Sequence, residues 1–221
     1  MSRERPILFS APMVCAILDG RKTQTRRLVR NPARLDGLML AGEEPEWSPY
    51  GRLGDRLWVR ETWRYADWTD DGMPYIEYAA DNARRLVEDV PEDWADRVEA
   101  VWARLSEPEN YGIDGKAADR KWRPSIFLPR WASRLTLEVT EVRVQQLQEI
   151  SEEDAIAEGV TTRCEERSND YHGDQTDHLT HATGACHVEA FAHLWDDING
   201  KRAPWSSNPW VWAITFREHR A

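Results

Sequence analysis

The chain has 221 residues, of which 41% are hydrophobic and 31% charged, as is typical of a soluble globular protein with one sizeable core. Its net charge of −10 argues against sequence-independent binding to nucleic acid, which needs a basic surface. Three widely spaced cysteines argue against a disulfide framework. No apolar run approaches the roughly 20 residues of a membrane span, and the first residues lack a signal-peptide core. We therefore expect a cytoplasmic protein with no membrane partner.

The basic side chains are concentrated in two segments of this acidic chain. Residues 1–30 contain seven basic and two acidic side chains, and residues 117–143 contain six basic and three acidic ones. If these segments meet in the fold, they form a local positive site on an acidic body. Such a site suits a small anionic or nucleotide-like ligand, or a short RNA, better than a long duplex.

A short strand, a helix and a dense basic motif open the chain. We predict a strand at residues 7–9 and a helix that begins after Ser10 and ends at Gly20, because serine caps helix starts and glycine ends helices. The motif GRKTQTRR, Gly20 to Arg27, follows directly in a turn and the start of a strand. Cations so closely spaced repel each other, so their clustering indicates an anionic or strongly polar ligand.

The middle of the chain predicts two ordered segments around a polar insertion. A turn at Gly54 and Asp55 precedes a strand at residues 57–59. Residues 64–120 are acidic and polar, and we interpret them as an insertion with a strand at 75–79 and a helix near 92–105, after which we expect order to return at residues 125–128.

The clearest strand pattern lies in the second half of the chain. Residues 134–144 alternate apolar and polar side chains, with one change of phase near Thr140 and Glu141. This pattern indicates a long strand with a bulge. Residues 209–216 predict the last strand.

Two helices and a second insertion lie between these strands. Ser151 begins a short helix that Gly159 ends, and residues 187–198 have helical apolar spacing. Residues 161–185 form a second polar insertion. Strands and helices mix without a regular βαβ rhythm, so we predict a single α+β domain over residues 1–221, with a curved sheet or small barrel.

The second insertion and its border contain residue types that bind zinc. They are Cys164, His172, His178, His181, Cys186 and His187. Their spacing includes no Cys-x-x-Cys pair, and one His-x-x-His pair is a weak indication of a metal site. We therefore interpret the segment as a polar loop and predict no metal and no other cofactor.

Gly20, Lys22 and Arg27 fit the pattern G-x-K-x-x-x-x-R, the signature of ASCH domains. The chain resembles the long ASCH-like proteins often encoded by phages and prophages. Further blocks extend the resemblance over about half of the chain, namely RPILFS at 5–10, GDRLWVRET at 54–62, WRPSI at 122–126, PRWASR at 129–134, residues 150–160 and NPWVW at 208–212. The resemblance implies a PUA-like fold, a small curved β-barrel with flanking helices, here carrying the two polar insertions at about 64–120 and 161–185.

ASCH and PUA-like domains are associated with RNA and modified nucleosides, and one branch of small ASCH proteins hydrolyses the amide of acetylcytidine. The resemblance implies that Lys22 is the proton acceptor, Thr25 the nucleophile and Glu158 the proton donor. These roles agree with elementary chemistry. A threonine hydroxyl attacks once a base takes its proton, and a lysine is such a base when burial or neighbouring cations lower its pKa. A nearby acid then protonates the leaving amine.

Further side chains are candidates for holding the ligand. Arginines suit a phosphate or an oxyanion, and Trp122, between two basic residues, is the best candidate for stacking on a base, although packing on the barrel explains it equally well. Glu61 either forms a structural ion pair or accepts a hydrogen bond from an exocyclic amine. The candidate ligand-binding residues are Arg21, Thr23, Arg26, Arg27, Glu61, Trp122 and Arg130.

Three functions stay open at this point. The first is an amidohydrolase that removes an acyl group from the exocyclic amine of a cytidine-type nucleoside. The second is a non-catalytic module, encoded by a phage or prophage, that binds RNA or a modified nucleotide. The third is an accessory protein that binds a protein partner through its acidic insertions.

Overall fold

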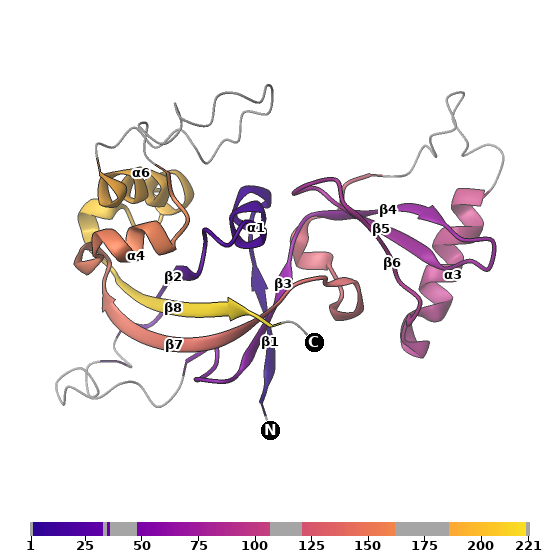
Figure 1. Ribbon diagram of the computed structural model, residues 1–221, viewed down its shortest axis with the longest axis horizontal. Helices are drawn as coiled ribbons and strands as arrows, with labels where there is room; N and C mark the ends of the chain where they lie inside the picture. The colour runs from indigo at the N-terminus through magenta and orange to yellow at the C-terminus, as the bar shows by residue number, and fades with distance from the viewer. Residues whose placement is uncertain (1, 33–34, 36–47, 107–120, 162–185, 220–221) are drawn as a thin grey trace. The chain divides into compact units, whose positions relative to one another are not determined.

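Two sheets and four helices make up the part of the chain that the computed structural model describes, which is residues 2–32, 35, 48–106, 121–161 and 186–219 (Figure 1). The helices are α1 (Ala11–Leu18), α3 (Glu92–Ser106), α4 (Glu152–Ala157) and α6 (His187–Asn199). The strands are β1 (Glu4–Leu8), β2 (Gln24–Leu28), β3 (Arg56–Arg60), β4 (Trp63–Trp68), β5 (Pro74–Tyr78), β6 (Arg84–Leu86), β7 (Thr136–Gln146) and β8 (Trp210–Glu218). The predicted α+β class is confirmed.

Most of the predicted helices and strands are confirmed to within a few residues, but β4 and β6 were not predicted. The polar side chains Arg64 and Asp67 hide the apolar alternation of β4, and β6 has only three residues, two of them arginines. Order was also expected at residues 125–128, where the structure has a short 3₁₀ helix (Ser125–Phe127).

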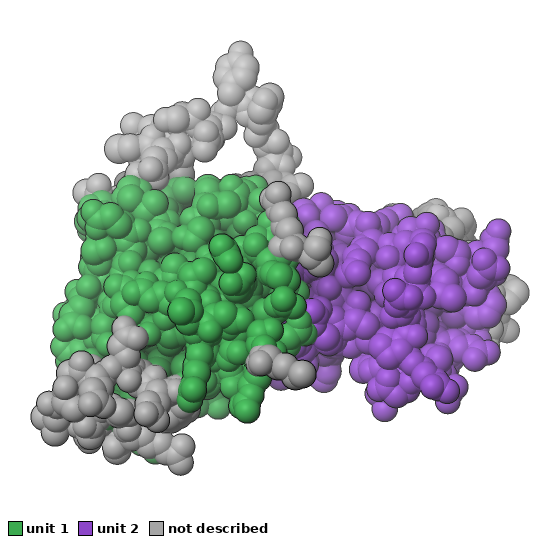
Figure 2. All heavy atoms as spheres, turned by 60° about the horizontal axis from the view of Figure 1, so that its bottom comes forward, with its two compact units in different colours: residues 1–5, 15–57, 136–221 green, residues 6–14, 58–135 purple. Residues whose placement is uncertain are grey.

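The chain forms two compact units (Figure 2). Unit 1 comprises residues 1–5, 15–57 and 136–221, and unit 2 comprises residues 6–14 and 58–135. The expected insertion at 64–120 lies within unit 2, where residues 107–120 are outside the described part. The expected insertion at 161–185 also lies outside the described part, except for residue 161.

A five-stranded sheet, in the order β1-β3-β7-β8-β2, supplies the strands of unit 1, and β1 and β3 continue into unit 2. The antiparallel strands β7 and β8 curve together along most of their length (Figure 1). Their register shifts between Val139 and Glu141, which confirms the predicted bulge. Within the described residues the sheet is open, with β1 and β2 at its ends, so a closed barrel is not confirmed.

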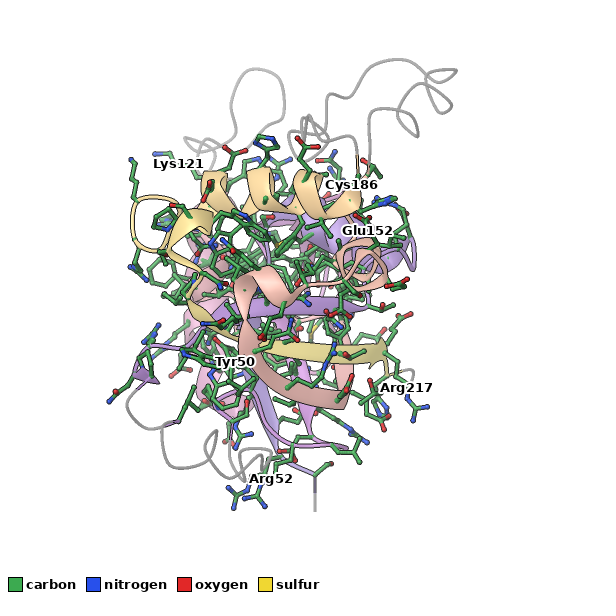
Figure 3. The ribbon with its side chains drawn as sticks, turned by 90° about the vertical axis from the view of Figure 1, so that its left-hand side faces the viewer. Tyr50, Arg52, Lys121, Glu152, Cys186 and Arg217 are labelled. Atoms are coloured by element: carbon green, nitrogen blue, oxygen red, sulfur yellow. The ribbon has the colours of Figure 1, made fainter. Side chains whose placement is uncertain are left out.

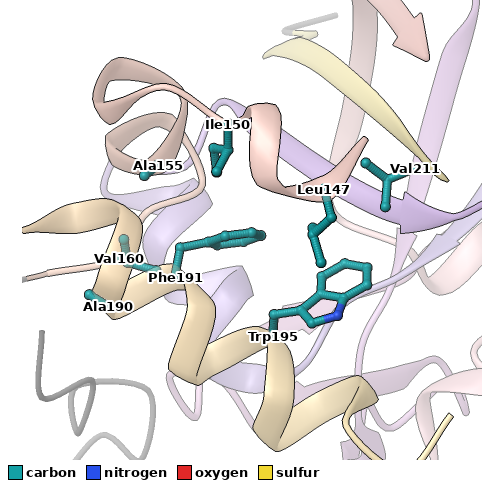
Figure 4. Packing of buried hydrophobic residues seen from close by; sticks show 8 residues of the cluster. All are labelled: Leu147, Ile150, Ala155, Val160, Ala190, Phe191, Trp195 and Val211. Carbon is teal, nitrogen blue, oxygen red and sulfur yellow. The ribbon is translucent and has the colours of Figure 1, made fainter. Parts of the chain in front are cut away.

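The apolar core of unit 1 lies where α4 and α6 pack beside the sheet (Figure 4). It consists of Leu147, Ile150, Ala155, Val160, Ala190, Phe191, Trp195 and Val211. The indole Nε1 of Trp195 donates a hydrogen bond of 2.8 Å to the carbonyl oxygen of Ala203. Burial of these side chains and this satisfied indole fix the position of α6, and α6 in turn supports α4.

Unit 2 has its own sheet and its own core. The sheet has the order β4-β5-β6, and the core gathers the aromatic side chains Trp63, Tyr65 and Tyr78 with smaller apolar residues. The hydroxyl of Tyr78 donates a hydrogen bond of 2.6 Å to the carbonyl oxygen of Ala132, which joins β5 to the segment before β7. Each unit therefore buries an apolar cluster of its own.

Candidate functional site

The basic motif is held between α1 and α4 by main-chain hydrogen bonds. Gly20 has a φ of 74°, the left-handed conformation predicted for the residue that ends α1. The N–H of Lys22 then donates to the carbonyl oxygen of Ala16 at 2.9 Å, and the N–H of Thr23 donates to that of Ala157 at 2.8 Å. The motif is thus fixed between α1 and α4 before it continues as β2.

Strand alternation divides the motif between two faces of β2. Arg27 Nη1 donates a hydrogen bond to Thr25 Oγ1, so these two side chains share one face. Arg26 Nη1 donates to Gln24 Oε1 at 2.6 Å on the other face. The pairing of β2 with β8, in which Thr25 lies opposite Ile214, fixes this assignment of faces.

A buried ion pair joins Lys22 to Glu158. Lys22 Nζ lies 2.7 Å from Glu158 Oε2 and also donates to the main-chain carbonyl oxygen of Glu158 at 2.9 Å. The two residues are 2% and 6% exposed. They are 136 positions apart in the sequence, and the structure brings them into direct contact.

Gly159 allows this close contact. Its φ is 82°, and a Cβ atom at this position would lie 2.9 Å from Lys22 Cβ and 3.2 Å from Ala16 Cβ. Any larger residue would push the end of α4 away from Lys22.

Burial lowers the pKa of Lys22 from its ordinary value. The Glu158 carboxylate opposes this shift, whereas the cations Arg27 and Arg26 add to it. The net direction moves Lys22 toward the neutral amine, which is the form that acts as a base. Thr25 is 0% exposed and accepts a hydrogen bond from Arg27, whose charge acts on both Lys22 and Glu158.

Arg26 points into the protein and forms three short contacts there. Its Nη1 donates to Gln24 Oε1 at 2.6 Å and to Glu158 Oε1 at 3.2 Å, and its Nη2 donates to Asp154 Oδ2 at 2.6 Å. Asp154 also accepts from Arg143 Nη2 at 3.1 Å. Charges therefore alternate from Arg143 through Asp154 and Arg26 to Glu158 and Lys22.

Sequence reasoning missed Asp154, Arg143 and Tyr50 as members of this site. From the sequence, Asp154 was placed only within the short helix that Ser151 begins. Its spacing of four residues from Glu158 would have placed both carboxylates on one helix face. Tyr50, labelled in Figure 3, interacts with Arg27 and Arg30. Burial raises the pKa of Tyr50, and the charges of the two arginines partly oppose this shift. Tyr50 lies in a segment rich in proline and glycine, which gives no indication of a site residue.

The other predicted ligand-binding residues of the motif differ in exposure. Arg21 is exposed, pairs with Asp19 at 2.9 Å and donates to the carbonyl oxygen of Gly159 at 3.3 Å. Thr23 is also exposed. Arg27 is half-buried and donates a hydrogen bond to Thr25, the predicted nucleophile.

Glu61, Trp122 and Arg130 belong to unit 2. Glu61 is 1% exposed and accepts two hydrogen bonds of 2.8 Å from Arg134, which is a bidentate ion pair. Trp122 is 39% exposed, and the guanidinium of Arg64 lies 4.3 Å from the centre of its ring. Arg130 is exposed.

Within the described residues, no group of three His, Cys, Asp or Glu side chains is arranged to hold a metal ion. Four of the zinc-ligand residue types, Cys164, His172, His178 and His181, lie outside the described residues. Cys186 and His187 begin α6, where Glu152 accepts hydrogen bonds from the main-chain N–H groups of His187 and Val188 (Figure 3). None of the helices in the described part is long and apolar enough to cross a membrane.

Comparison with known proteins does not assign a family. No protein-family model matches the chain, and no curated protein matches it. Among solved structures, the chain is similar to protein EF3133 from Enterococcus faecalis V583, whose crystal structure is described as DUF984, with 12% sequence identity and a TM-score of 0.31. The similarity covers 92% of this chain and 64% of that protein, so the chain spans less than two thirds of that protein's length. The resemblance to ASCH domains is not confirmed by these comparisons.

Proposed function

We propose that the chain is an ASCH-like protein of PUA-like fold that recognises a nucleoside or nucleotide and removes an acyl group from the exocyclic amine of a cytidine-type base. The observation that carries this proposal is the buried contact between Lys22 and Glu158, together with the hydrogen bond from Arg27, whose charge acts on both of them, to Thr25. A base, an acid and a hydroxyl are the three groups that amide hydrolysis through an acyl-enzyme requires.

The Lys22–Glu158 pair shares one proton, and its position decides whether the pair can act. With the proton on Lys22 the pair is ionic, and with the proton on Glu158 it consists of a neutral amine and a neutral acid. Burial favours the neutral amine of Lys22, because a buried charge loses its hydration. The mechanism needs this neutral amine as the proton acceptor and a protonated Glu158 as the proton donor.

Thr25 supplies the nucleophile in this mechanism. Its Oγ1 accepts a hydrogen bond from Arg27, so its own hydrogen is directed to another acceptor, and the adjacent positive charge stabilises a developing alkoxide. Lys22 takes the proton while Oγ1 attacks the acyl carbonyl carbon. Glu158 protonates the amine nitrogen as the C–N bond breaks, and water then hydrolyses the acyl-threonine ester.

Binding without hydrolysis is the second candidate, and the burial of Thr25 favours it. Thr25 is 0% exposed, so a substrate carbonyl reaches it only after neighbouring side chains such as Arg27 move. A module that binds a modified nucleotide or short RNA needs no such access. Its basic side chains would contact phosphate, with affinity that falls as salt rises.

Incubation with a panel of N4-acylated cytidines, followed by chromatography, separates the two candidates. The hydrolase predicts release of cytidine that Thr25→Ala abolishes and Thr25→Ser partly retains. Thr23→Ala is the matched control, because Thr23 is exposed and lies outside the proposed chemistry. Full activity in Thr25→Ala rejects the mechanism. Absence of release together with salt-sensitive binding supports the second candidate, whereas binding unchanged between low and high salt counts against it.

A further inference from the structure

Arg26 is a fully buried charged side chain of the motif and is paired with two carboxylates. Its side chain is 0% exposed, and both of its terminal nitrogens donate to carboxylates, one to Glu158 and one to Asp154. A guanidinium in this position has no surface to offer to a phosphate. Its role therefore differs from the anion-binding role that the density of basic residues suggested.

Asp154 and Glu158 compete for the guanidinium of Arg26, because both accept hydrogen bonds from it. It lies 2.6 Å from Arg26 Nη2, against 3.2 Å between Glu158 Oε1 and Arg26 Nη1. The shorter contact directs Arg26 toward Asp154 and leaves the other carboxylate oxygen, Glu158 Oε2, to Lys22 at 2.7 Å. Gln24 supports this arrangement by donating to Asp154 Oδ1 at 3.0 Å and accepting from Arg26.

We propose that Arg26, Asp154 and Arg143 form a positioning network that holds the Glu158 carboxylate on Lys22 and so sets the proton distribution within that pair. These three are positioning residues, because they act through Glu158 and not on a ligand. The catalytic consequence rests on the proposed function, whereas the effect on Lys22 itself does not.

The charged groups around Lys22 determine the direction in which a change in this network shifts the pKa of Lys22. Glu158 faces Lys22 from the end of α4, and Arg26 and Arg27 face it from β2. Tyr50 acts on Arg27, α1 contributes Ala16, and the exposed Asp19–Arg21 ion pair lies in the turn after α1. A change that draws Glu158 toward Arg26, or removes a negative charge, lowers the pKa of Lys22. A change that leaves Glu158 more fully to Lys22 raises it.

Two substitutions are expected to move Lys22 in opposite directions. Asp154→Asn removes the carboxylate that competes for Arg26, so Arg26 attracts Glu158 more strongly and Lys22 loses its proton at lower pH than in the wild type. Arg143→Gln removes the second cation from Asp154, which then binds Arg26 more tightly, so Lys22 keeps its proton to higher pH. Glu153→Gln on the exposed side of α4 is the control for losing one negative charge and is expected to leave Lys22 unchanged.

Titration of the full chain by carbon-13 NMR of labelled lysine Cε groups reads this effect directly. The chain has four lysines, Lys22, Lys116, Lys121 and Lys201, so the Lys22 signal can be assigned by its loss in Lys22→Arg. Opposite shifts in Asp154→Asn and Arg143→Gln support the network. Arg143 is 35% exposed at its side chain, so its variant keeps the test decisive if Asp154→Asn fails to fold.

The same variants separate this inference from the proposed hydrolysis. If the Lys22 titration shifts as expected and no acylcytidine is cleaved, the network stands and the hydrolase is rejected. If cleavage occurs and the titration of Lys22 is the same in all folded variants, the network is rejected and the hydrolase stands. If both hold, the acid limb of the kcat/KM profile moves with Lys22, to lower pH in Asp154→Asn.

Discussion

Gly159 shows at the scale of a single residue how closely the chain around Lys22 is packed. Gly159 and Gly54 have the same φ of 82°, but a Cβ at Gly159 would lie 2.9 Å from Lys22 Cβ, whereas a Cβ at Gly54 would meet nothing within 4 Å. We expect Gly54→Ala to cost about 1 kcal/mol, the strain of the left-handed conformation, and Gly159→Ala about 3 kcal/mol, because overpacking is added.

Urea denaturation of the two glycine variants measures this difference. The additional cost in Gly159→Ala is expected to be accompanied by disruption of the Lys22–Glu158 contact, since Glu158 directly precedes Gly159. Equal destabilisation by the two substitutions would show that the close approach to Lys22 does not exist in solution.

Asp55 provides a pH-dependent test at the same scale. Burial alone would raise the pKa of Asp55, but hydrogen bonds from the main-chain N–H groups of Arg3 and Arg52 and the charge of Arg5 outweigh it and lower the pKa. A carboxyl whose pKa is lowered by folding stabilises the folded state at any pH above its pKa in the unfolded chain. This contribution is lost as the pH falls through the pKa of the carboxyl in the folded state. We therefore expect Asp55→Asn to reduce stability at pH 7 and to resemble the wild type in strong acid.

Thermal unfolding of the wild type and of Asp55→Asn from pH 7 down to about pH 2 measures this contribution. This pH range covers the ordinary pKa values of carboxyl groups. Glu153→Gln is a suitable control, because its carboxylate is exposed. A stability difference that stays constant over the whole range would contradict the assignment.

At the scale of elements, the short helix α4 positions two carboxylates of the candidate site, Asp154 and Glu158. It has six residues, Glu152–Ala157, which include Asp154, and Glu158 is its C-cap. Ser151 Oγ accepts a hydrogen bond from the N–H of Asp154 at 3.1 Å, which confirms the predicted cap. Since a helix of this length depends on its ends, loss of the cap affects both carboxylates at once.

We expect Ser151→Ala to destabilise the protein by about 1 kcal/mol, while Ser151→Asp keeps the cap and nearly all of the stability. Denaturant titration measures the stability, and the Lys22 NMR signal reports whether Glu158 stays in place. Ser151→Ala with unchanged stability and an unchanged Lys22 signal would mean that the cap contributes nothing to α4.

Local patterns predicted the elements of unit 1 better than the contacts between them. The phase change near Thr140 located the bulge of β7, and Ser151 located α4, because each signal lies within the element that it defines. The contact between Arg26 and Asp154 joins residues 128 positions apart, and no local pattern contains it. The sequence therefore suggested Lys22 and Thr25 through the motif and Glu158 through the resemblance of residues 150–160, but it gave no indication that Arg26 contacts Asp154.

At the scale of the whole molecule, each unit has a core of its own, so stability is expected to be distributed in two parts. Tyr78 offers a local test, because its hydroxyl donates to Ala132 at 2.6 Å inside unit 2 and burial raises its pKa to about 12. We expect Tyr78→Phe to cost about 1–2 kcal/mol, since the Ala132 carbonyl loses its donor.

Hydrogen exchange is expected to increase in β5 of Tyr78→Phe and to stay nearly unchanged in β8, which belongs to unit 1. Trp195→Phe is the matching variant, because it removes the donor to Ala203 in the core of unit 1. Its effect is expected in β8 and α6. Equal loss of protection in both units for either variant would show that the two cores unfold as one.

The alternation along β2 has a consequence for how this sequence tolerates insertions and deletions. Thr25 and Arg27 share one face of the strand, and Gln24 and Arg26 share the other. One residue added or removed between Lys22 and Thr25 exchanges the two faces, so the hydroxyl would turn to the side of Asp154 and the structural arginine to the side of Thr25. Two added residues restore the faces but displace Lys22 from Thr25. The number of residues between Lys22 and Thr25 thus determines which face of β2 each side chain occupies. A change in that number removes the candidate site even when every side chain type is retained.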